Sequence, residues 1–273
     1  MKNLRFIKGL EEITKNDLYL AGGKGANLGE MIHAGLPVPE GFVLLTNSYE
    51  KFVETNGLKI KIENLLKKID NDDFKSVEEA SVKIHSLFEN GDIPQDIIEA
   101  LDFAYGFLGN SAVAVRSSAT AEDLPGSSFA GQYDTYLNIK GKKELYKYMK
   151  KCWASLWNSR ALAYRLKHNI DNKDLGHGVV VQRLIDAEKS GILFTANPVN
   201  GRRDQMLLNS SWGLGEAIVG GEVSPDQWII NKNKGIIVEK KIAKKEIMAA
   251  RKENGIEFRE IPKEKQEEIS LRK

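Results

Sequence analysis

The chain has 273 residues, of which 41% are hydrophobic and 29% charged, as in an ordinary globular protein large enough for two domains. Its formal net charge of +2 argues against a nucleic-acid partner, and no apolar run approaches the roughly 18–20 residues that cross a membrane. The single cysteine, Cys152, excludes an internal disulfide, and the first residues lack a signal-peptide pattern. These features predict a cytoplasmic protein with Cys152 as a core thiol.

Residues 19–35, YLAGGKGANLGEMIHAG, predict a glycine-rich turn followed by a helix from about Gly25 to Gly35. Lys24 lies in the turn. Unpaired N–H groups and the positive dipole end make a helix N-terminus suitable for an anion, and a lysine adds charge there. The spacing is not that of a Walker A loop, and a structural loop with an exposed lysine fits equally.

Residues 42–45 predict a strand, and residues 48–108 have a helical pattern that indicates scaffold. In this region Ser76 and Glu79 match a capping box, while Pro94 opens a helix that Gly109 closes.

Residues 112–139 predict a strand that ends at Arg116, a loop of small and hydroxyl residues, and a strand from Thr135. Such a loop can place N–H and hydroxyl groups against phosphate oxygens, and an arginine can hold a phosphate in bidentate fashion. A structural salt bridge is the alternative for Arg116. The pattern favours phosphoryl chemistry.

Residues 144–168 predict one amphipathic helix, on which Arg160 and Arg165 form salt bridges or cover the surface. The pattern then changes to short strands, with a short helix or helical turn within 213–221. The strands are expected at 178–185, 190–196, 205–211 and 226–232, and a further one at 235–239. The charged run from Lys240 onward is typical of a solvated face or a loose end.

Two polar residues of this second part are candidates for nucleotide contacts. Gln182 interrupts an apolar strand, so its amide could read an adenine edge or lie on the solvent face of the strand. Glu216 could approach a metal ion or a ribose hydroxyl, or cap a turn. We therefore predict an α+β, ATP-grasp-like fold with two lobes around a nucleotide cleft.

The expected organisation has three parts. Residues 1–175 form an N-terminal lobe with the phosphate-binding loop and a helical insert at about 48–109. Residues 176–245 form a second, strand-rich and incomplete lobe, and residues 246–273 form a charged tail.

Seven motifs occur in order between Asn3 and Lys245: GGKGANLGEM, AGLPVPEGF, VAVRSSATAEDLPGSSFAGQYDTYLNI, CWASLWNSRALAYR, VVVQRL, SGILFTANPVNG and NSSWGLGEAIVGG. Together they strongly resemble the N-terminal ATP-binding domain of the phosphoenolpyruvate synthase and pyruvate phosphate dikinase family. Rifampin phosphotransferase, an antibiotic-inactivating member, is about equally similar.

The resemblance implies an ATP-grasp domain that cleaves ATP to AMP and phosphate. The β-phosphoryl group would pass to a histidine on a separate swivelling domain, and from there to pyruvate or to the drug. By motif, Lys24 and Arg116 would hold the phosphates, Gly131 and Thr135 would lie beside them, and Gln182 would lie by the adenine.

Two departures from the family pattern matter. The closing segment, with a Glu and later a Gln and an Arg, is not matched here, and Gln266 is a poor substitute. We therefore expect the Mg²⁺ ligands to lie C-terminal to this chain. A motif for a phosphorylatable histidine is also absent, and His33, His85, His168 and His177 are interpreted as structural or surface residues.

These departures predict a piece of a larger enzyme or a stand-alone ATP module, inactive by itself. The swivelling phosphohistidine domain and the acceptor-binding domain would be its partners. A non-catalytic nucleotide-binding module is the alternative from another class.

Overall fold

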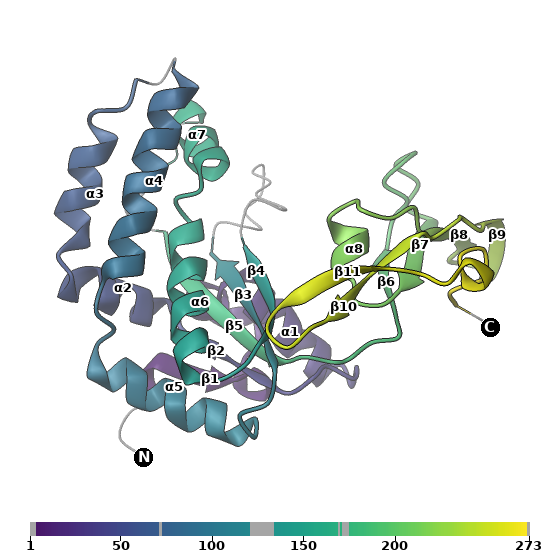
Figure 1. Cartoon of the computed structure of the whole chain (residues 1–273), viewed down its shortest axis with the longest axis horizontal. Helices are drawn as coiled ribbons and strands as arrows, with labels where there is room; N and C mark the ends of the chain where they lie inside the picture. Colours follow the sequence, from purple (N-terminus) through teal and green to yellow (C-terminus); the bar gives the residue numbers. More distant parts are fainter. Residues whose placement is uncertain (1–3, 71–72, 121–133, 169, 171–174, 272–273) are drawn as a thin grey trace. The chain divides into compact units, whose positions relative to one another are not determined.

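The structure is a computed structural model, and it describes residues 4–70, 73–120, 134–168, 170 and 175–271. The chain divides into two compact units, one ending at Leu184 and the other beginning at Ile185. Each unit contains both helices and strands, so the predicted α+β class is confirmed (Figure 1).

The first unit is built on one five-stranded antiparallel sheet with the strand order β1-β2-β5-β3-β4. β3 continues three residues beyond Arg116, where the sequence pattern predicted its end, because these residues pair with the start of β5. The strands are β1 (Ile7–Gly9), β2 (Gly41–Leu44), β3 (Val113–Ala119), β4 (Thr135–Ile139) and β5 (His177–Arg183).

β5 belongs to this sheet and not to the second lobe, where the sequence analysis placed it. It pairs with β2 on one side and β3 on the other. Val179 and Val181 pack into the large core of the unit, while Val180 packs into a smaller cluster on the opposite face. A central strand that is buried on both faces has a continuous apolar sequence. Such a sequence predicts a strand but does not indicate which sheet the strand belongs to.

Helices cover both faces of the sheet. Ala21 of α1 packs with Val180 and Val43 on one face, whereas Met149 and Trp153 of α6 pack on the other (Figure 1). The helices are α1 (Leu18–His33), α2 (Thr46–Thr55), α3 (Leu58–Leu66), α4 (Phe74–Asn90), α5 (Gln95–Phe107), α6 (Lys142–Ser155) and α7 (Ser159–Lys167). Of the helices in the described part of the chain, none has the length and apolarity needed to span a bilayer.

Two predicted helix boundaries are wrong. α4 begins after Asp73, whose side chain accepts a hydrogen bond from the Lys75 N–H, so Ser76 is not its cap. The predicted helix over 144–168 is divided into α6 and α7, because Asn158 has extended backbone angles (φ −53°, ψ 140°). Trp157 at this break is held by Ser81 and by Tyr49, a tertiary restraint that helical periodicity does not show.

The second unit contains a four-stranded antiparallel sheet in the order β6-β7-β8-β9, a short helix and a separate hairpin. The helix α8 (Glu216–Val219) follows β7, in the stretch that predicted a short helix. The strands are β6 (Lys189–Phe194), β7 (Gln205–Trp212), β8 (Asp226–Asn231), β9 (Ile236–Lys241), β10 (Ile247–Arg251) and β11 (Ile256–Glu260).

The charged C-terminal run is folded, so the expectation of a loose end is wrong, while most of its described side chains are exposed, in agreement with a solvated face. The Lys245 ammonium lies 2.6 Å from the Asp226 carboxylate, and both side chains are fully buried. Ser270 donates hydrogen bonds to the same carboxylate from its backbone N–H and its hydroxyl, both at 2.7 Å. Asp226 thus attaches both Lys245 and Ser270 to the start of β8. The chain between Lys245 and Ser270 contains the β10–β11 hairpin.

Candidate functional site

Three of the predicted site residues lie on one face of the first sheet. Arg116 in β3 pairs directly with Thr135 in β4 on one side and with Val180 in β5 on the other. Directly opposite residues of antiparallel strands point to the same face, and residues two apart on one strand do so as well. Gln182 lies two residues after Val180, so Arg116, Thr135 and Gln182 share a face. We call it the α1 face, because Val180 packs there with Ala21.

The glycine-rich turn that carries Lys24 is fixed to the same strand by Ser118. The Ser118 hydroxyl donates to the Ala21 carbonyl at 2.7 Å and accepts from the Gly25 N–H at 3.1 Å. Between them, Gly22 has φ +71°, and a Cβ there would collide with the Ser118 carbonyl. The turn therefore requires glycine, and it holds the Lys24 backbone beside the strand that carries Arg116.

The glycine turn starts a helical segment, as the sequence pattern predicted, although a short helical segment precedes the turn. α1 already begins at Leu18, and Gly22 interrupts its helical angles (φ 71°, ψ 172°). Lys24 thus follows a kink within α1. Lys24 lies near the N-terminus of the segment that follows the kink, where the Ser118 hydroxyl accepts from the Gly25 N–H, so anion binding at this helix start stays a prediction.

The Lys24 charge affects the interior at the start of β5. Burial, together with the charges of Lys24 and Arg165, lowers the pKa of His177 to about 3, although the hydrogen bond with the Cys152 backbone opposes the shift. The His177 Nε2 lies 2.8 Å from the Cys152 carbonyl, and both residues are fully buried. His177 is therefore neutral and structural, and Cys152 is a core thiol, as predicted.

The remaining predicted residues have different environments. Gln182 is 7% exposed and its Nε2 donates to the Pro39 carbonyl at 3.0 Å, so the solvent-face alternative is wrong. Thr135 is exposed, and Gly131 lies outside the described residues. Glu216 belongs to the second unit, at the first position of α8, where burial raises the pKa of its carboxyl group.

Arg165 is fully buried, with its guanidinium 5.3 Å from the centre of the Trp157 ring. The prediction of a surface position is therefore wrong for this residue, which makes a cation–π contact inside the core, whereas Arg160 is exposed as predicted.

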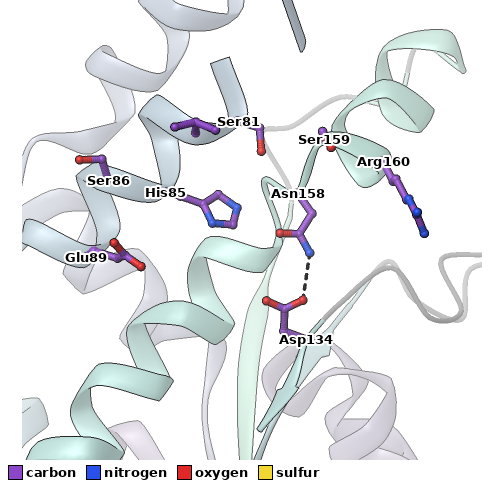
Figure 2. A pocket seen from close by; sticks show the side chains of 9 residues that line it. Ser81, His85, Ser86, Glu89, Asp134, Asn158, Ser159 and Arg160 are labelled. Carbon is purple, nitrogen blue, oxygen red and sulfur yellow. Dashed lines mark hydrogen bonds between the residues drawn. The ribbon is translucent and has the colours of Figure 1, made fainter. Parts of the chain in front are cut away.

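Sequence reasoning missed Asp134, the residue before Thr135. Its carboxylate accepts a hydrogen bond from the Tyr136 hydroxyl at 2.6 Å. It accepts a second from the Asn158 Nδ2 at 3.2 Å (Figure 2). Its backbone carbonyl accepts from the N–H and the hydroxyl of Ser117. An acid at the entry of a predicted strand is the one sequence signal, and it does not reveal these partners.

Asp134 borders a cavity of about 560 Å³ between α4 and the start of α7 (Figure 2). His85 and Ser81 line one side, and Asn158 and Arg160 line another. Burial lowers the pKa of His85, while the charges of Asp134 and Glu89 oppose this shift. A second cavity, of about 960 Å³, lies against α2 and α3. Among the described residues that line these two cavities, none is a predicted site residue.

Within the described residues, no group of three or more His, Cys, Asp or Glu side chains could hold a metal ion.

Known proteins match the chain over nearly its full length. The model of the family described as pyruvate phosphate dikinase, AMP/ATP-binding domain, matches residues 18–273. A probable phosphoenolpyruvate synthase from Methanocaldococcus jannaschii is 45% identical over 97% of this chain and 23% of its own length. The phosphoenolpyruvate synthase from Pyrococcus furiosus is 43% identical over 90% of this chain and 35% of its own length.

A third relative, the probable phosphoenolpyruvate synthase from Methanothermobacter thermautotrophicus, is 41% identical over 96% of this chain and 39% of its own length. The chain thus spans between about a quarter and two fifths of these relatives. The matched residues include the glycine turn with Lys24 and the whole first sheet beyond β1. The chain belongs to the pyruvate phosphate dikinase AMP/ATP-binding domain family.

Proposed function

We propose that this chain is the ATP-binding domain of a dikinase-type phosphotransferase that serves phosphoenolpyruvate synthesis from pyruvate. ATP would be cleaved to AMP and phosphate, and the β-phosphoryl group would pass to a histidine on a separate domain. Family membership and the names of the relatives support this assignment. The observation that carries it is the α1 face, where Arg116, Thr135 and Gln182 project from three adjacent strands beside the fixed Lys24 turn.

The chemistry of this face suits a polyphosphate. Arg116 offers a planar guanidinium that can bind two phosphate oxygens, and Lys24 offers a compact point charge. The exposed Thr135 hydroxyl, directly opposite Arg116, adds a donor. Catalysis of phosphoryl transfer depends mainly on positioning and on cations near the developing charge, so we assign these roles to Lys24 and Arg116.

The remaining assignments extend the same proposal. Gln182 would line the adenine end of the face, where its carbonyl oxygen and the second N–H of its Nε2 would be the adenine-facing groups, since one N–H is donated to the Pro39 carbonyl. Gly131 would lie beside the phosphates, and Glu216 of the second unit would approach the ribose. The two units would be the lobes of an ATP-grasp fold. The Mg²⁺ ligands would follow this chain in sequence, and no step here is routed through the metal.

The first test is binding of a non-hydrolysable ATP analogue to the full-length protein by calorimetry. Arg116→Ala and Lys24→Ala are each expected to weaken binding by roughly 10-fold or more, since each removes a charge-assisted contact with phosphate. Arg5→Ala is the matched control, because Arg5 is exposed and paired with Asp96. Unchanged affinity in both site variants would refute the proposal.

The second test separates the alternatives by product. Release of AMP and phosphate with pyruvate as acceptor supports phosphoenolpyruvate synthesis, whereas turnover only with rifampin indicates a rifampin phosphotransferase. Analogue binding without any turnover in the full-length protein identifies a non-catalytic nucleotide-binding module.

A further inference from the structure

We propose that Asp134 is a positioning residue that holds Thr135 opposite Arg116 in the phosphate site. The inference rests on the proposed function, because it takes Arg116 and Thr135 as ligand-binding groups. Asp134 does not need to touch the nucleotide for this role. It acts through the backbone geometry of the residue that follows it.

The first support is the backbone contact at the entry of β4. The Asp134 carbonyl accepts hydrogen bonds from the Ser117 N–H at 3.1 Å and from the Ser117 hydroxyl at 2.9 Å. Ser117 directly follows Arg116 in β3. These two hydrogen bonds lie next to the Arg116–Thr135 pair, at the end of the β3–β4 ladder, and they hold that pair in register.

The second support is the direction of the side chains. Thr135 faces the α1 face, and the alternation of a strand turns its two neighbours to the opposite face. Tyr136 packs against the large core, and its hydroxyl donates to the Asp134 carboxylate at 2.6 Å. Asp134 and Tyr136 are thus joined behind Thr135. This bond restrains the strand at Thr135 and leaves the ligand face open.

The third support is the anchor on the far side of the carboxylate. Asn158, which donates from Nδ2 at 3.2 Å, lies at the break between α6 and α7 (Figure 2). The preceding Trp157 is fixed twice, since its carbonyl accepts from the Ser81 hydroxyl at 2.7 Å and its Nε1 donates to the Tyr49 hydroxyl at 3.1 Å. The anchor of Asp134 is therefore attached to the core of the helical part and not to a surface side chain.

The unit contains a matched carboxylate whose hydrogen-bond partners among the described residues lie outside the proposed phosphate site. Asp102 on α5 accepts hydrogen bonds from the Tyr146 hydroxyl and from Lys142 at 2.8 Å. It therefore also joins a tyrosine hydroxyl to a second donor, but between two helices. Asp102→Ala and Tyr146→Phe are the controls for Asp134→Ala and Tyr136→Phe.

The experiment measures the dissociation constant of a non-hydrolysable ATP analogue and the melting temperature for these four variants and Asp134→Asn in the full-length protein. Asp134→Ala is expected to weaken analogue binding about 10-fold, because a small misplacement of ligand-binding groups is costly. Tyr136→Phe, which loses one hydrogen bond, should weaken it about 3-fold. Asp134→Asn keeps an acceptor oxygen for Tyr136 and should recover most of the affinity.

The control variants are expected to lower the melting temperature to a similar degree while leaving analogue affinity unchanged. If Asp134→Ala and Tyr136→Phe behave like their controls, Asp134 is only structural and the inference is wrong. Should Asp134→Ala fail to fold, the comparison of Tyr136→Phe with Tyr146→Phe decides. If Arg116→Ala also leaves affinity unchanged, the proposed function itself fails, so the two failures are distinguishable.

Discussion

An aspartate holds a connecting segment in place in each unit, but the surroundings of the two carboxylates differ. Asp134 is half-buried, borders a cavity and accepts hydrogen bonds from neutral donors. Asp226 is completely buried and bonded to the Lys245 ammonium, which is also completely buried. The first carboxylate lies next to a candidate ligand group, and the second is enclosed within a folding contact. The difference in burial thus distinguishes an aspartate that can support a ligand site from one that only stabilises the fold.

Replacement of the enclosed carboxylate should have the largest effect. Burial alone raises the pKa of Asp226, but hydrogen bonds from Lys245, Ser270 and Ala243 outweigh this and lower it. Asp226→Ala would leave the Lys245 charge buried without its counter-ion and free the Ser270 end of the chain. We expect a loss of about 3 to 5 kcal/mol in the free energy of unfolding of the second unit, measured by hydrogen exchange of β8 amides.

A paired replacement provides the control for this effect. Asp226→Leu combined with Lys245→Met removes both charges and keeps apolar volume, so it should cost much less than the single change. If the single and paired variants are equally unstable, the unpaired Lys245 charge is not the cause of the destabilisation. The contrast drawn between the two aspartates would then be wrong.

The second largest difference should be in how the stability of each unit responds to acid. His177 in the first unit has a pKa of about 3 in the folded state, so it stays neutral while the unfolded chain takes up a proton below about 6.5. The stability of this unit therefore falls as pH falls from 6.5, by up to about 1.4 kcal/mol per pH unit, or about 2 to 3 kcal/mol by pH 4.5. The lowered pKa of Asp226 affects the second unit only below its ordinary value of 3.8.

Hydrogen exchange of β5 and β8 amides in one sample, between pH 6.5 and 4.5, measures both units under identical conditions. The free energy of opening measured at the β5 amides should fall over this pH range. Asp226 should cause no such fall at the β8 amides. His177→Gln should reduce the slope for β5, since it removes the buried titrating group. Equal slopes in the wild-type and His177→Gln proteins would contradict the assignment of the effect to His177.

The elements were more predictable than their partners. α2 to α5 lie in the predicted helical region, and β5 to β9 fall close to the predicted strand ranges, because local periodicity encodes them. β10 and β11, in the charged C-terminal run, were not predicted. The sheet that β5 joins was not predictable, since Val179–Val181 reads as a buried strand in either unit. The break at Asn158 was also missed, because it depends on contacts with α2 and α4.

The site shows the same division. Arg116 was identifiable as the charge that ends an apolar run, and in the structure it is the half-buried residue of an otherwise buried β3, which continues to Ala119. Asp134 was not identifiable, because its partners Ser117 and Asn158 lie 17 and 24 residues away in sequence. The order of the charged C-terminal run was likewise hidden, since composition cannot show that Lys245 meets Asp226.

The smallest expected effect concerns Ser118, the neutral anchor of the Lys24 turn. Ser118→Ala removes a buried hydroxyl that serves the Ala21 carbonyl and the Gly25 N–H, which should cost about 1 to 2 kcal/mol of the free energy of unfolding of the first unit. Ser155→Ala is the matched control, because Ser155 is equally buried and its hydroxyl donates to the Cys152 carbonyl at 2.7 Å within its own helix.

Denaturant titration gives the stability of both serine variants, and calorimetry gives their affinity for the ATP analogue. Only Ser118→Ala should also weaken analogue binding, because only that serine fixes the turn that carries Lys24. A loss of stability without any loss of affinity would mean that the position of Lys24 does not depend on this anchor. The face that Arg116, Thr135 and Gln182 share would then bind the nucleotide without the turn, and Lys24 would act through the reach of its side chain alone.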